Sequence, residues 1–251
     1  MKHLLSRENR EVLAQLAWSR VLVAFDFDGT LAPIVSARDD AGMRTRTREL
    51  FEHVCGLYPC AVISGRSKAD VASRLGSAQI KYVIGNHGLE PGSGLSEFEG
   101  EVRRARTLLD ESSLGLLGID LEDKRYSLAL HYRRSRNKRA ARAQILTAIA
   151  ALPVAMRVVP GKLVVNVVPA RAPNKGEALL ELRGVEGADT ALYVGDDVTD
   201  EDVFELDQPG RLLTVRIGES RSSAAAYFLR DQREMDRLLA KLAALRQKRV
   251  A

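Results

Sequence analysis

Short apolar runs alternate with amphipathic segments along most of the chain. A continuous apolar run bounded by turn residues is typical of a strand buried on both faces, as in a parallel sheet covered by helices. Segments with apolar residues three or four positions apart are typical of the helices that cover such a sheet. The predicted strands are 21–25, 60–63, 81–84 and 190–194, and the predicted helices are 44–54, 67–75 and 231–247.

This alternation predicts an α/β fold with a Rossmann-like, doubly wound parallel sheet. The middle of the chain departs from it, because a helix over 98–112 precedes a hairpin and a helix over 137–151 precedes a second pair of strands. That order, α-β-β-α-β-β, indicates an inserted α+β domain over 94–170. The core domain then consists of 1–93 and 171–251.

The composition is that of a globular protein with enough material for two domains. The chain has 251 residues, of which 45% are hydrophobic and 28% are charged. No apolar run approaches the roughly 20 residues of a membrane helix, and the first residues, MKHLLSRENR, turn polar at once. We therefore expect a cytoplasmic protein without a membrane partner. Cys55 and Cys60 are expected to be reduced thiols, with a disulfide or a metal site as the alternatives.

The net charge of +5 favours an anionic partner, and the densest basic run is RRSRNKRAAR over 133–142. Such a run suits either a nucleic acid or the rim of a site for a small anionic substrate. Surfaces for single-stranded nucleic acid interleave basic residues with stacking aromatics, whereas aromatic residues make up only 5% of this chain. We therefore expect a small-molecule substrate, no nucleic acid, and a monomer.

Chemically capable side chains follow the predicted strands at their carboxyl ends, where sites in parallel sheets lie. Asp26 and Asp28 follow the first strand, Ser64 follows the second, and Asp196 follows the strand over 190–194. A further feature is Lys175, at the start of a predicted helix. The carboxylates would repel one another without a cation between them, and oxygen ligands of this kind suit Mg²⁺.

Helix starts close to these residues predict anion binding. The pairs Ser67 with Asp70, Asn174 with Glu177, and Thr199 with Asp202 each place a capping residue three positions before an acid. The unpaired N–H groups at such helix starts attract phosphate. Mg²⁺ and phosphate occur together in phosphoryl transfer, in which an aspartate can act as the nucleophile.

The ordered set DFDGT, SGR, helix-start lysine and GDDVTDEDVF resembles the four motifs of phosphatases of the haloacid dehalogenase superfamily, and the insertion resembles their C2-type cap domain. More narrowly, the chain resembles the trehalose-6-phosphate phosphatases. The stretches FDFDGTLAPI, GNHGLE, LEDKRYSLALHYR and VGDDVTDEDVF carry this resemblance, which runs from about residue 20 to residue 240. It implies an Mg²⁺-dependent phosphatase acting on trehalose 6-phosphate.

The resemblance also implies catalytic roles. Asp26 would be the nucleophile that becomes an aspartyl phosphate. Asp28 would donate a proton to the leaving sugar oxygen and then take one from the hydrolytic water, because one proton carrier can serve both half-reactions. Ser64 and Lys175 would hold the phosphoryl oxygens.

The same resemblance implies a metal site and a substrate site. Mg²⁺ would be held by Asp26, by the backbone oxygen of Asp28 and by Asp196, with Asp197 and Asp200 just outside or as additional ligands. A substrate site would be shared between the two domains. Its residues would be Gly65, Arg66, Asn86, His87, Gly88 and Glu90 on the core side, and Lys124, His131, Arg133, Lys162 and Asn166 on the cap side.

Alternatives stay open for several of these residues. His87 is also explained as a turn histidine, and the strand pattern around His131 also fits a side chain in solvent. The family pattern has a glutamate where this chain has Asn166, and a basic residue where it has Val168. Asparagine carries no charge and both donates and accepts hydrogen bonds. Another sugar phosphate is therefore an alternative substrate, and a silent partner of a sugar-phosphate synthase or an RNA-binding protein is an alternative of another class.

Overall fold

The computed structural model describes residues 1–35, 38–111, 117–206 and 208–250. It divides into two compact units, a core unit of residues 1–88 and 174–251 and an inserted unit of residues 89–173. The α/β fold class with an α+β insertion is confirmed. The predicted insertion, 94–170, lies within the inserted unit.

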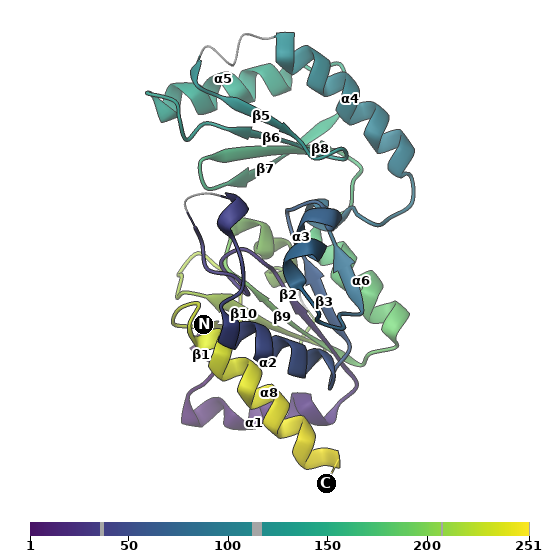
Figure 1. Cartoon of the computed structure of the whole chain (residues 1–251), viewed down its shortest axis with the longest axis vertical. Helices are drawn as coiled ribbons and strands as arrows, with labels where there is room; N and C mark the ends of the chain where they lie inside the picture. The colour runs from purple at the N-terminus through teal and green to yellow at the C-terminus, as the bar shows by residue number, and fades with distance from the viewer. Residues whose placement is uncertain (36–37, 112–116, 207, 251) are drawn as a thin grey trace. The chain divides into compact units, whose positions relative to one another are not determined.

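A parallel sheet forms the centre of the core unit (Figure 1). Within the described residues the strand order is β1-β11-β10-β9-β2-β3-β4, and every pairing is parallel. The strands are β1 (Lys2–His3), β2 (Val21–Phe25), β3 (Cys60–Ile63), β4 (Tyr82–Ile84), β9 (Thr190–Gly195), β10 (Leu212–Ile217) and β11 (Tyr227–Leu229). The apolar run that opens the sequence pattern, β2, lies between β9 and β3 and is fully buried.

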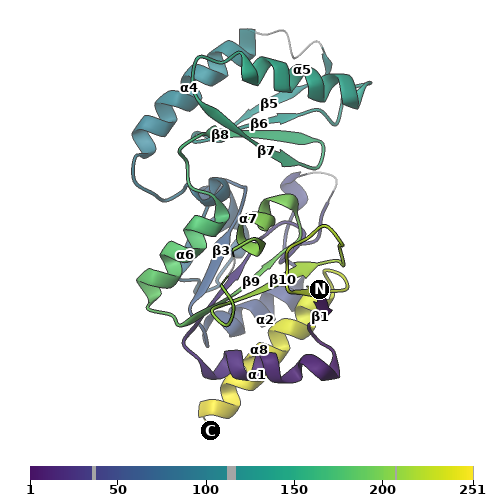
Figure 2. The same ribbon diagram turned by 180° about the vertical axis from the view of Figure 1, so that it is seen from behind.

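Helices cover both faces of this sheet, as Figures 1 and 2 show from opposite sides. On one face α1 (Arg10–Trp18), α2 (Thr45–Cys55), α3 (Lys68–Leu75) and α8 (Glu234–Val250) pack against alternate strand residues such as Val23 and Phe25. On the other face α6 (Lys175–Glu186) and α7 (Glu201–Phe204) pack against Leu22, Ala24 and Tyr193. Because successive strand residues point to opposite faces, a continuous apolar strand supplies both cores.

The inserted unit is an antiparallel sheet covered by two helices. Its elements are α4 (Leu95–Glu111), β5 (Asp120–Asp123), β6 (Leu128–His131), α5 (Lys138–Ala150), β7 (Met156–Gly161) and β8 (Val164–Pro169), and its strand order is β5-β6-β8-β7. Leu128, Leu130, Val165 and Val167 belong to the apolar core shared with α4 and α5. The intervening residues of β6 and β8 therefore belong to the opposite face of the sheet.

Two further observations bear on the sequence predictions. Among the helices of the described ranges, none is both long and apolar enough to cross a bilayer. Cys55 and Cys60 are buried and free of a disulfide. The hydrogen bond to Cys55, followed by burial, raises the pKa of the Cys60 thiol well above its usual value.

Candidate active site

Asp26 is the first residue after β2, at the carboxyl end of this inner strand. Its backbone N–H donates to the Val194 carbonyl at 2.9 Å, so the ladder between β2 and β9 continues one residue past the strand. This bond fixes the point at which the chain leaves the sheet, and the Asp26 side chain is held there with the residue only 5% exposed. The strand pairing, rather than a flexible loop, thus positions this carboxylate.

The turn after Asp26 brings the loop that follows β2 against the loop that follows β9. Gly29 adopts a φ of 81°, a left-handed conformation that favours glycine. A Cβ added there would lie 2.1 Å from a carboxylate oxygen of Asp196. The Thr30 hydroxyl also faces Asp196, at 3.5 Å from the other oxygen. Glycine is therefore needed at position 29 both for its backbone conformation and for the space that Asp196 occupies.

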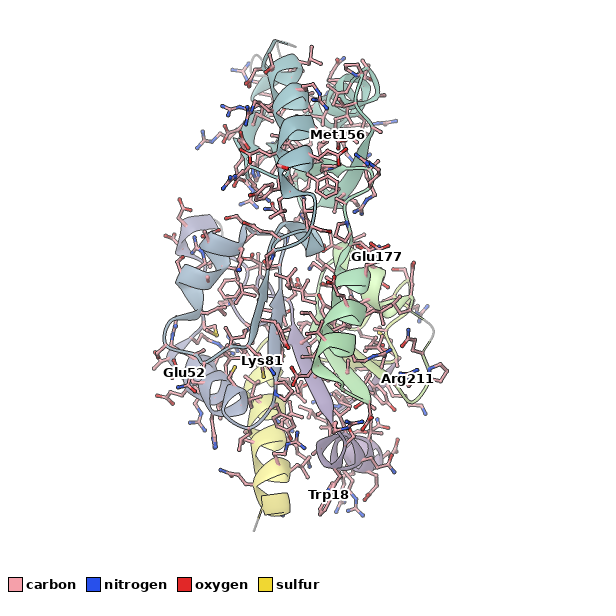
Figure 3. The ribbon with its side chains drawn as sticks, turned by 90° about the vertical axis from the view of Figure 1, so that its right-hand side faces the viewer. Trp18, Glu52, Lys81, Met156, Glu177 and Arg211 are labelled. Atoms are coloured by element: carbon pink, nitrogen blue, oxygen red, sulfur yellow. The ribbon has the colours of Figure 1, made fainter. Side chains whose placement is uncertain are left out.

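Lys175 enters the site from the first residue of α6. Asn174 caps this helix and forms a reciprocal capping box with Glu177, which Figure 3 labels at the start of the helix. The Lys175 ammonium donates to Asp26 at 3.0 Å and to Asp200 at 2.8 Å. Its side chain is only 2% exposed. A lysine buried to this extent requires such carboxylate partners, because an unpaired buried charge is costly.

Asp200 organises the other side of the cluster. One of its oxygens accepts from Lys175 and from the Tyr193 hydroxyl, the latter at 2.7 Å. The other accepts from the backbone N–H groups of Asp196 and Asp197, at 2.8 and 2.9 Å. Gly195 makes room for this arrangement, since a Cβ there would lie 2.2 Å from the Asp200 carboxyl carbon. Asp200 thereby shapes the loop that carries Asp196.

The charges of this cluster favour bound cations or protons. Burial raises the pKa of Asp26 well above its usual value, and Lys175 offsets only part of that effect. Burial, with Asp200 and Asp197 nearby, raises the pKa of Asp196 to about 7. Burial alone would lower the pKa of Lys175, but Asp200 and Asp26 outweigh it and raise that pKa overall. Lys175 therefore stays protonated. Its single positive charge is not enough to balance the negative charges of Asp26, Asp196 and Asp200.

Among the described residues, Asp26, Asp196 and Asp200 each offer a carboxylate oxygen within 4.8 Å of the others. Because both Asp200 oxygens already accept hydrogen bonds, the carboxylates of Asp26 and Asp196 are the better ligands for a hard cation. Asp28 lies two residues beyond Asp26, and its side chain turns to Arg66 instead of joining this group.

The loop after β3 supplies Ser64, Gly65 and Arg66. Ser64 is 1% exposed, and its hydroxyl oxygen accepts the Arg66 N–H at 3.2 Å. Gly65 lies against the imidazole of His87, and a Cβ there would lie 2.5 Å from that ring. Arg66 forks onto both oxygens of Asp28, at 2.6 and 2.7 Å. The structure therefore brings the SGR sequence and Asp28 together.

The loop after β4 packs against the SGR loop. Asn86 and His87 adopt φ values of 49° and 61°, and their N–H groups donate to the Arg66 and Ser64 carbonyls at 2.7 and 3.0 Å. A Cβ on Gly88 would lie 2.4 Å from the Asn174 carbonyl oxygen, so glycine lets this loop approach the start of α6. Asn86 and His87 are both buried.

The remaining predicted substrate residues lie in the inserted unit. Lys124 donates to the Asn166 side-chain oxygen at 3.3 Å, and the Asn166 amide donates to the Val159 carbonyl at 3.4 Å. His131 Nε2 lies 2.9 Å from a Glu122 oxygen, with the ring 34% exposed. The register pairs Ala129 with both Glu122 and Asn166, which places these residues in one row across β5, β6 and β8. Arg133 and Lys162 are exposed, whereas Glu90 is half-buried.

Some residues of this site were not singled out by sequence reasoning. Tyr193 lies in the apolar strand β9, where an aromatic residue is expected for packing alone, so nothing in the sequence marks its hydroxyl as part of the site. Asp70 was noted only as the acid of a helix start, yet it accepts from Arg66 at 2.8 Å. Its spacing of four residues from Arg66 and from Arg74 was an available signal.

Comparison with known proteins identifies the family of this chain. Residues 24–233 match the family model described as trehalose-phosphatase. The chain belongs to the trehalose-phosphatase family. It is 28% identical over 265 residues to "Trehalose-phosphate phosphatase B" of Arabidopsis thaliana, covering 96% of this chain and 71% of that protein. It is 32% identical over 234 residues to "Trehalose-phosphate phosphatase" of Mycobacterium avium, covering 85% of this chain and 60% of that one.

The fold of this trehalose-phosphatase family member agrees with solved structures. The C-terminal domain of trehalose-6-phosphate phosphatase from C. albicans superposes with a TM-score of 0.75 at 22% identity, covering 94% of this chain and 97% of that one. The predicted resemblance and the predicted enzyme class are confirmed, and the chain is a phosphatase. The family match also spans every motif on which the resemblance was based, from Asp26 to Asp200.

Proposed function

We propose that this phosphatase hydrolyses trehalose 6-phosphate to trehalose and phosphate, with Mg²⁺ and through a phosphorylated Asp26. The observation that carries the proposal is the Asp26 carboxylate at the end of β2, which is buried and accepts from the Lys175 ammonium at 3.0 Å. A carboxylate presented beside a fixed positive charge suits attack on an anionic phosphate ester. The names of the plant and mycobacterial relatives support the substrate class.

The donor set fits Mg²⁺. The Asp26 and Asp196 carboxylates are close together, and burial raises the pKa of both, so a hard dication would relieve their repulsion. Mg²⁺ would be held by these side chains and by the backbone oxygen of Asp28, with Asp200 orienting Lys175 and Asp197 completing the loop. When bound, the ion neutralises negative charge on the phosphoryl group and orients it.

The first half-reaction is transfer of the phosphoryl group to Asp26. An Asp26 oxygen attacks phosphorus, and the bond between phosphorus and the sugar oxygen breaks. The leaving alkoxide is a strong base, so its departure needs a proton, which protonated Asp28 donates. The products are the free sugar and an aspartyl phosphate, with Asp28 now a carboxylate.

The second half-reaction returns Asp26 to its starting state. Asp28 removes a proton from water, and the water oxygen attacks phosphorus. The bond between phosphorus and the Asp26 oxygen breaks, which releases inorganic phosphate and leaves Asp28 protonated for the next cycle. One water is consumed per ester, so atoms and charge balance over the two steps.

The phosphoryl oxygens need positive charge and hydrogen-bond donors throughout. Lys175 supplies a permanent charge, because its carboxylate partners raise its pKa. The Ser64 hydroxyl, buried at the carboxyl end of β3, would donate to one oxygen. Both groups are fixed before substrate arrives, which is the arrangement that stabilises a transition state without reorganisation.

Each unit offers its own candidate residues for recognition of the sugar. Lys124, His131 and Asn166 belong to one side of the inserted sheet, opposite its apolar core. Arg133 and Lys162 add exposed positive charge in the same unit. In the core unit the candidates are Gly65, Arg66, Asn86, His87 and Gly88, in the loops after β3 and β4, whereas Glu90, predicted for the core side, falls in the inserted unit. Hydrogen bonding to several hydroxyls is what separates one sugar phosphate from another.

A panel assay tests the proposal. Phosphate release is measured with Mg²⁺ on trehalose 6-phosphate, sucrose 6-phosphate, glucose 6-phosphate and glucosyl-3-phosphoglycerate. We expect preference for trehalose 6-phosphate, and no turnover in Asp26→Asn, which keeps the shape of the side chain but removes the nucleophile. Asp189→Asn, which breaks an exposed pair with Arg20 at 2.7 Å, is the matched control and should keep full activity.

Three results would decide against parts of the proposal. Turnover by Asp26→Asn would exclude the aspartyl-phosphate route. Full activity in excess chelator would exclude the metal. Preference for another sugar phosphate, still dependent on Asp26, would keep the chemistry and assign the different specificity to the inserted unit, where Asn166 replaces the glutamate of the family pattern.

A further inference from the structure

Four charged side chains form a row that ends at Asp28. The Arg66 guanidinium donates from Nε and Nη2 to the two Asp28 oxygens, and from Nη1 to Asp70 at 2.8 Å. Asp70 in turn accepts from Arg74 Nε at 2.8 Å. The signs alternate along the row, so each charge has an opposite neighbour.

Helix α3 explains why the row is rigid. Asp70 lies in the first turn of α3 and Arg74, four residues later, in its last turn, so their side chains share one face of the helix, while Arg66 reaches Asp70 from the residue before the cap. Ser67 caps the helix by accepting the Asp70 N–H at 3.3 Å. At the far end, Arg74 donates to the Asp39 and Ala41 carbonyls at 2.9 and 2.8 Å.

Exposure changes along the row in an informative way. The Arg66 side chain is 5% exposed and that of Arg74 is 15% exposed, whereas the Asp28 side chain is 41% exposed. A carboxylate as exposed as Asp28 rotates about its own bonds unless a partner fixes it. The planar guanidinium of Arg66 fixes both Asp28 oxygens at once. This requires that the guanidinium plane is itself held in place.

We propose that Asp70 and Arg74 are positioning residues for Asp28 and act on it through Arg66. Asp70 holds the one guanidinium nitrogen that Asp28 does not use, and Arg74 holds Asp70. In each half-reaction one Asp28 oxygen carries or receives the proton, while the other keeps its bond to Arg66. This inference rests on the proposed role of Asp28 as proton carrier, and it gives Arg66 a role in addition to sugar binding.

Asp70→Asn is the decisive variant, because it keeps the size of the side chain and removes the charge that holds Arg66. A displaced acid and base slows turnover without weakening substrate binding. We therefore expect kcat on trehalose 6-phosphate to fall by roughly 10- to 100-fold, with KM within about twofold of the parent. Asp70→Glu, which restores a carboxylate, should recover part of the loss, and Arg74→Gln should show the same pattern more weakly.

An aryl phosphate with a stable leaving anion, 2,4-dinitrophenyl phosphate, separates positioning from general damage. Its departure needs no proton, so kcat/KM, which reports phosphorylation of Asp26, should be unchanged in Asp70→Asn to within about twofold. Equal losses on both substrates would mean that the substitution damages the whole site. A rise in KM for the sugar phosphate at constant kcat would mean that Asp70 serves sugar binding. Either result overturns the proposal.

A double variant gives an independent test. If Asp70 acts through Asp28, adding Asp70→Asn to Asp28→Asn should cost no further activity, whereas independent effects would multiply. Asp189→Asn again serves as the control for loss of an Arg–Asp fork elsewhere. The parent and Asp26→Asn are assayed first. The parent shows which sugar phosphate is used, and Asp26→Asn shows whether Asp26 is needed for turnover. A failure of the proposed function is therefore recognised before the Asp70 variants are interpreted.

Discussion

The Tyr193 hydroxyl donates a hydrogen bond to the Asp200 carboxylate at 2.7 Å, and both side chains are fully buried. Tyr193 belongs to β9, next to the strand that presents Asp26, and Asp200 is also bonded to Lys175. The side chains of Tyr193, Asp200 and Lys175 thus link the sheet to the Asp26 carboxylate. Burial raises the pKa of Tyr193 well above its usual value, so the hydroxyl stays a donor.

Tyr193→Phe should therefore destabilise the core unit. Loss of a buried hydrogen bond to a charged acceptor costs about 1.5–3 kcal/mol, and this loss should appear in the free energy of unfolding by urea. Tyr82→Phe is the matched control, because the Tyr82 hydroxyl donates to Glu186 at the same 2.7 Å in a partly exposed site. Its cost should be about 1 kcal/mol or less. Equal costs would show that burial of the Tyr193 pair does not matter.

Gly29→Ala should abolish most of the activity. The new Cβ would clash with Asp196 at 2.1 Å, in addition to the strain of a φ of 81°. We expect at least a roughly 100-fold loss of kcat, in line with displacement of a site residue by about 1 Å, and weaker stabilisation by Mg²⁺. Gly187→Ala carries similar strain at a φ of 62° with nothing within 4 Å. It should lose about 1 kcal/mol of stability and keep its kcat.

Removal of Mg²⁺ should lower the melting temperature and abolish turnover. A ligand at 100 times its Kd stabilises the folded state by about 2.7 kcal/mol. Asp196→Asn should lose this response, yet in chelator it should melt at or above the parent, because it removes one of the mutually repelling carboxylates. A variant that melts well below the parent in chelator would show that Asp196 is held by the fold for a structural reason.

Glu234 should contribute stability that depends on pH. Burial alone would raise its pKa, but the Arg230 N–H and the His3 ring outweigh burial and lower it. A carboxyl group with a lowered folded pKa stabilises the fold above its unfolded pKa of about 4.3, and this contribution is lost as the pH falls through the folded value. Glu234→Gln should therefore cost about 1 kcal/mol at neutral pH and little in acid.

The pH test needs an exposed comparison. Glu11 pairs with Arg10 at 3.2 Å with both side chains mostly exposed, so Glu11→Gln should change stability little at any pH. Unfolding in urea at several pH values measures both variants. A Glu234→Gln deficit that persists undiminished in acid would assign the effect to packing and not to charge.

Asn166→Ala should raise KM for the sugar phosphate by roughly tenfold and leave kcat within about twofold, as expected for loss of uniform binding. The substitution removes the acceptor of Lys124 and the donor to Val159, both in the inserted unit, whereas Asp26 and Asp28 belong to the core unit. Inhibition by inorganic phosphate should be unchanged. Asn137→Ala, which removes the cap of α5, should cost stability and leave KM alone.

The sheet and the position of its site were accessible from sequence because both follow from local pattern. The apolar runs over 21–25 and 60–63 became β2 and β3 with those bounds. Parallel strands bring their carboxyl ends to one edge, so Asp26 and Asp196 had to meet once their strands were neighbours. The strands β1, β10 and β11 were not predicted, because they are short or only half-buried and lack a continuous apolar signal.

Side-chain partners were less accessible. The pattern placed a helix cap at Thr199, and this was wrong. The capping residue is Asp197, with Asp200 as the acid that reaches back. Because this stretch contains several acids, the sequence offers several equivalent candidates for the capping pair. Only the folded structure shows which pair forms. The pairing of Asp28 with Arg66 likewise depends on how close the loops after β2 and β3 lie in the fold. That distance cannot be predicted from the spacing of the two residues along the chain.

The split core unit has a consequence for biosynthesis. The contact between Asp26 and Lys175 spans 149 residues of sequence, and β2 pairs with β9, which follows the whole inserted unit. During translation, β2 therefore leaves the ribosome with β3 as its partner but with its other edge unpaired. The inserted unit has a core of its own and can fold in the interval. The Asp26 carboxylate can therefore gain its Lys175 partner only after the whole inserted unit has been synthesised, and closure of so long a loop is slow.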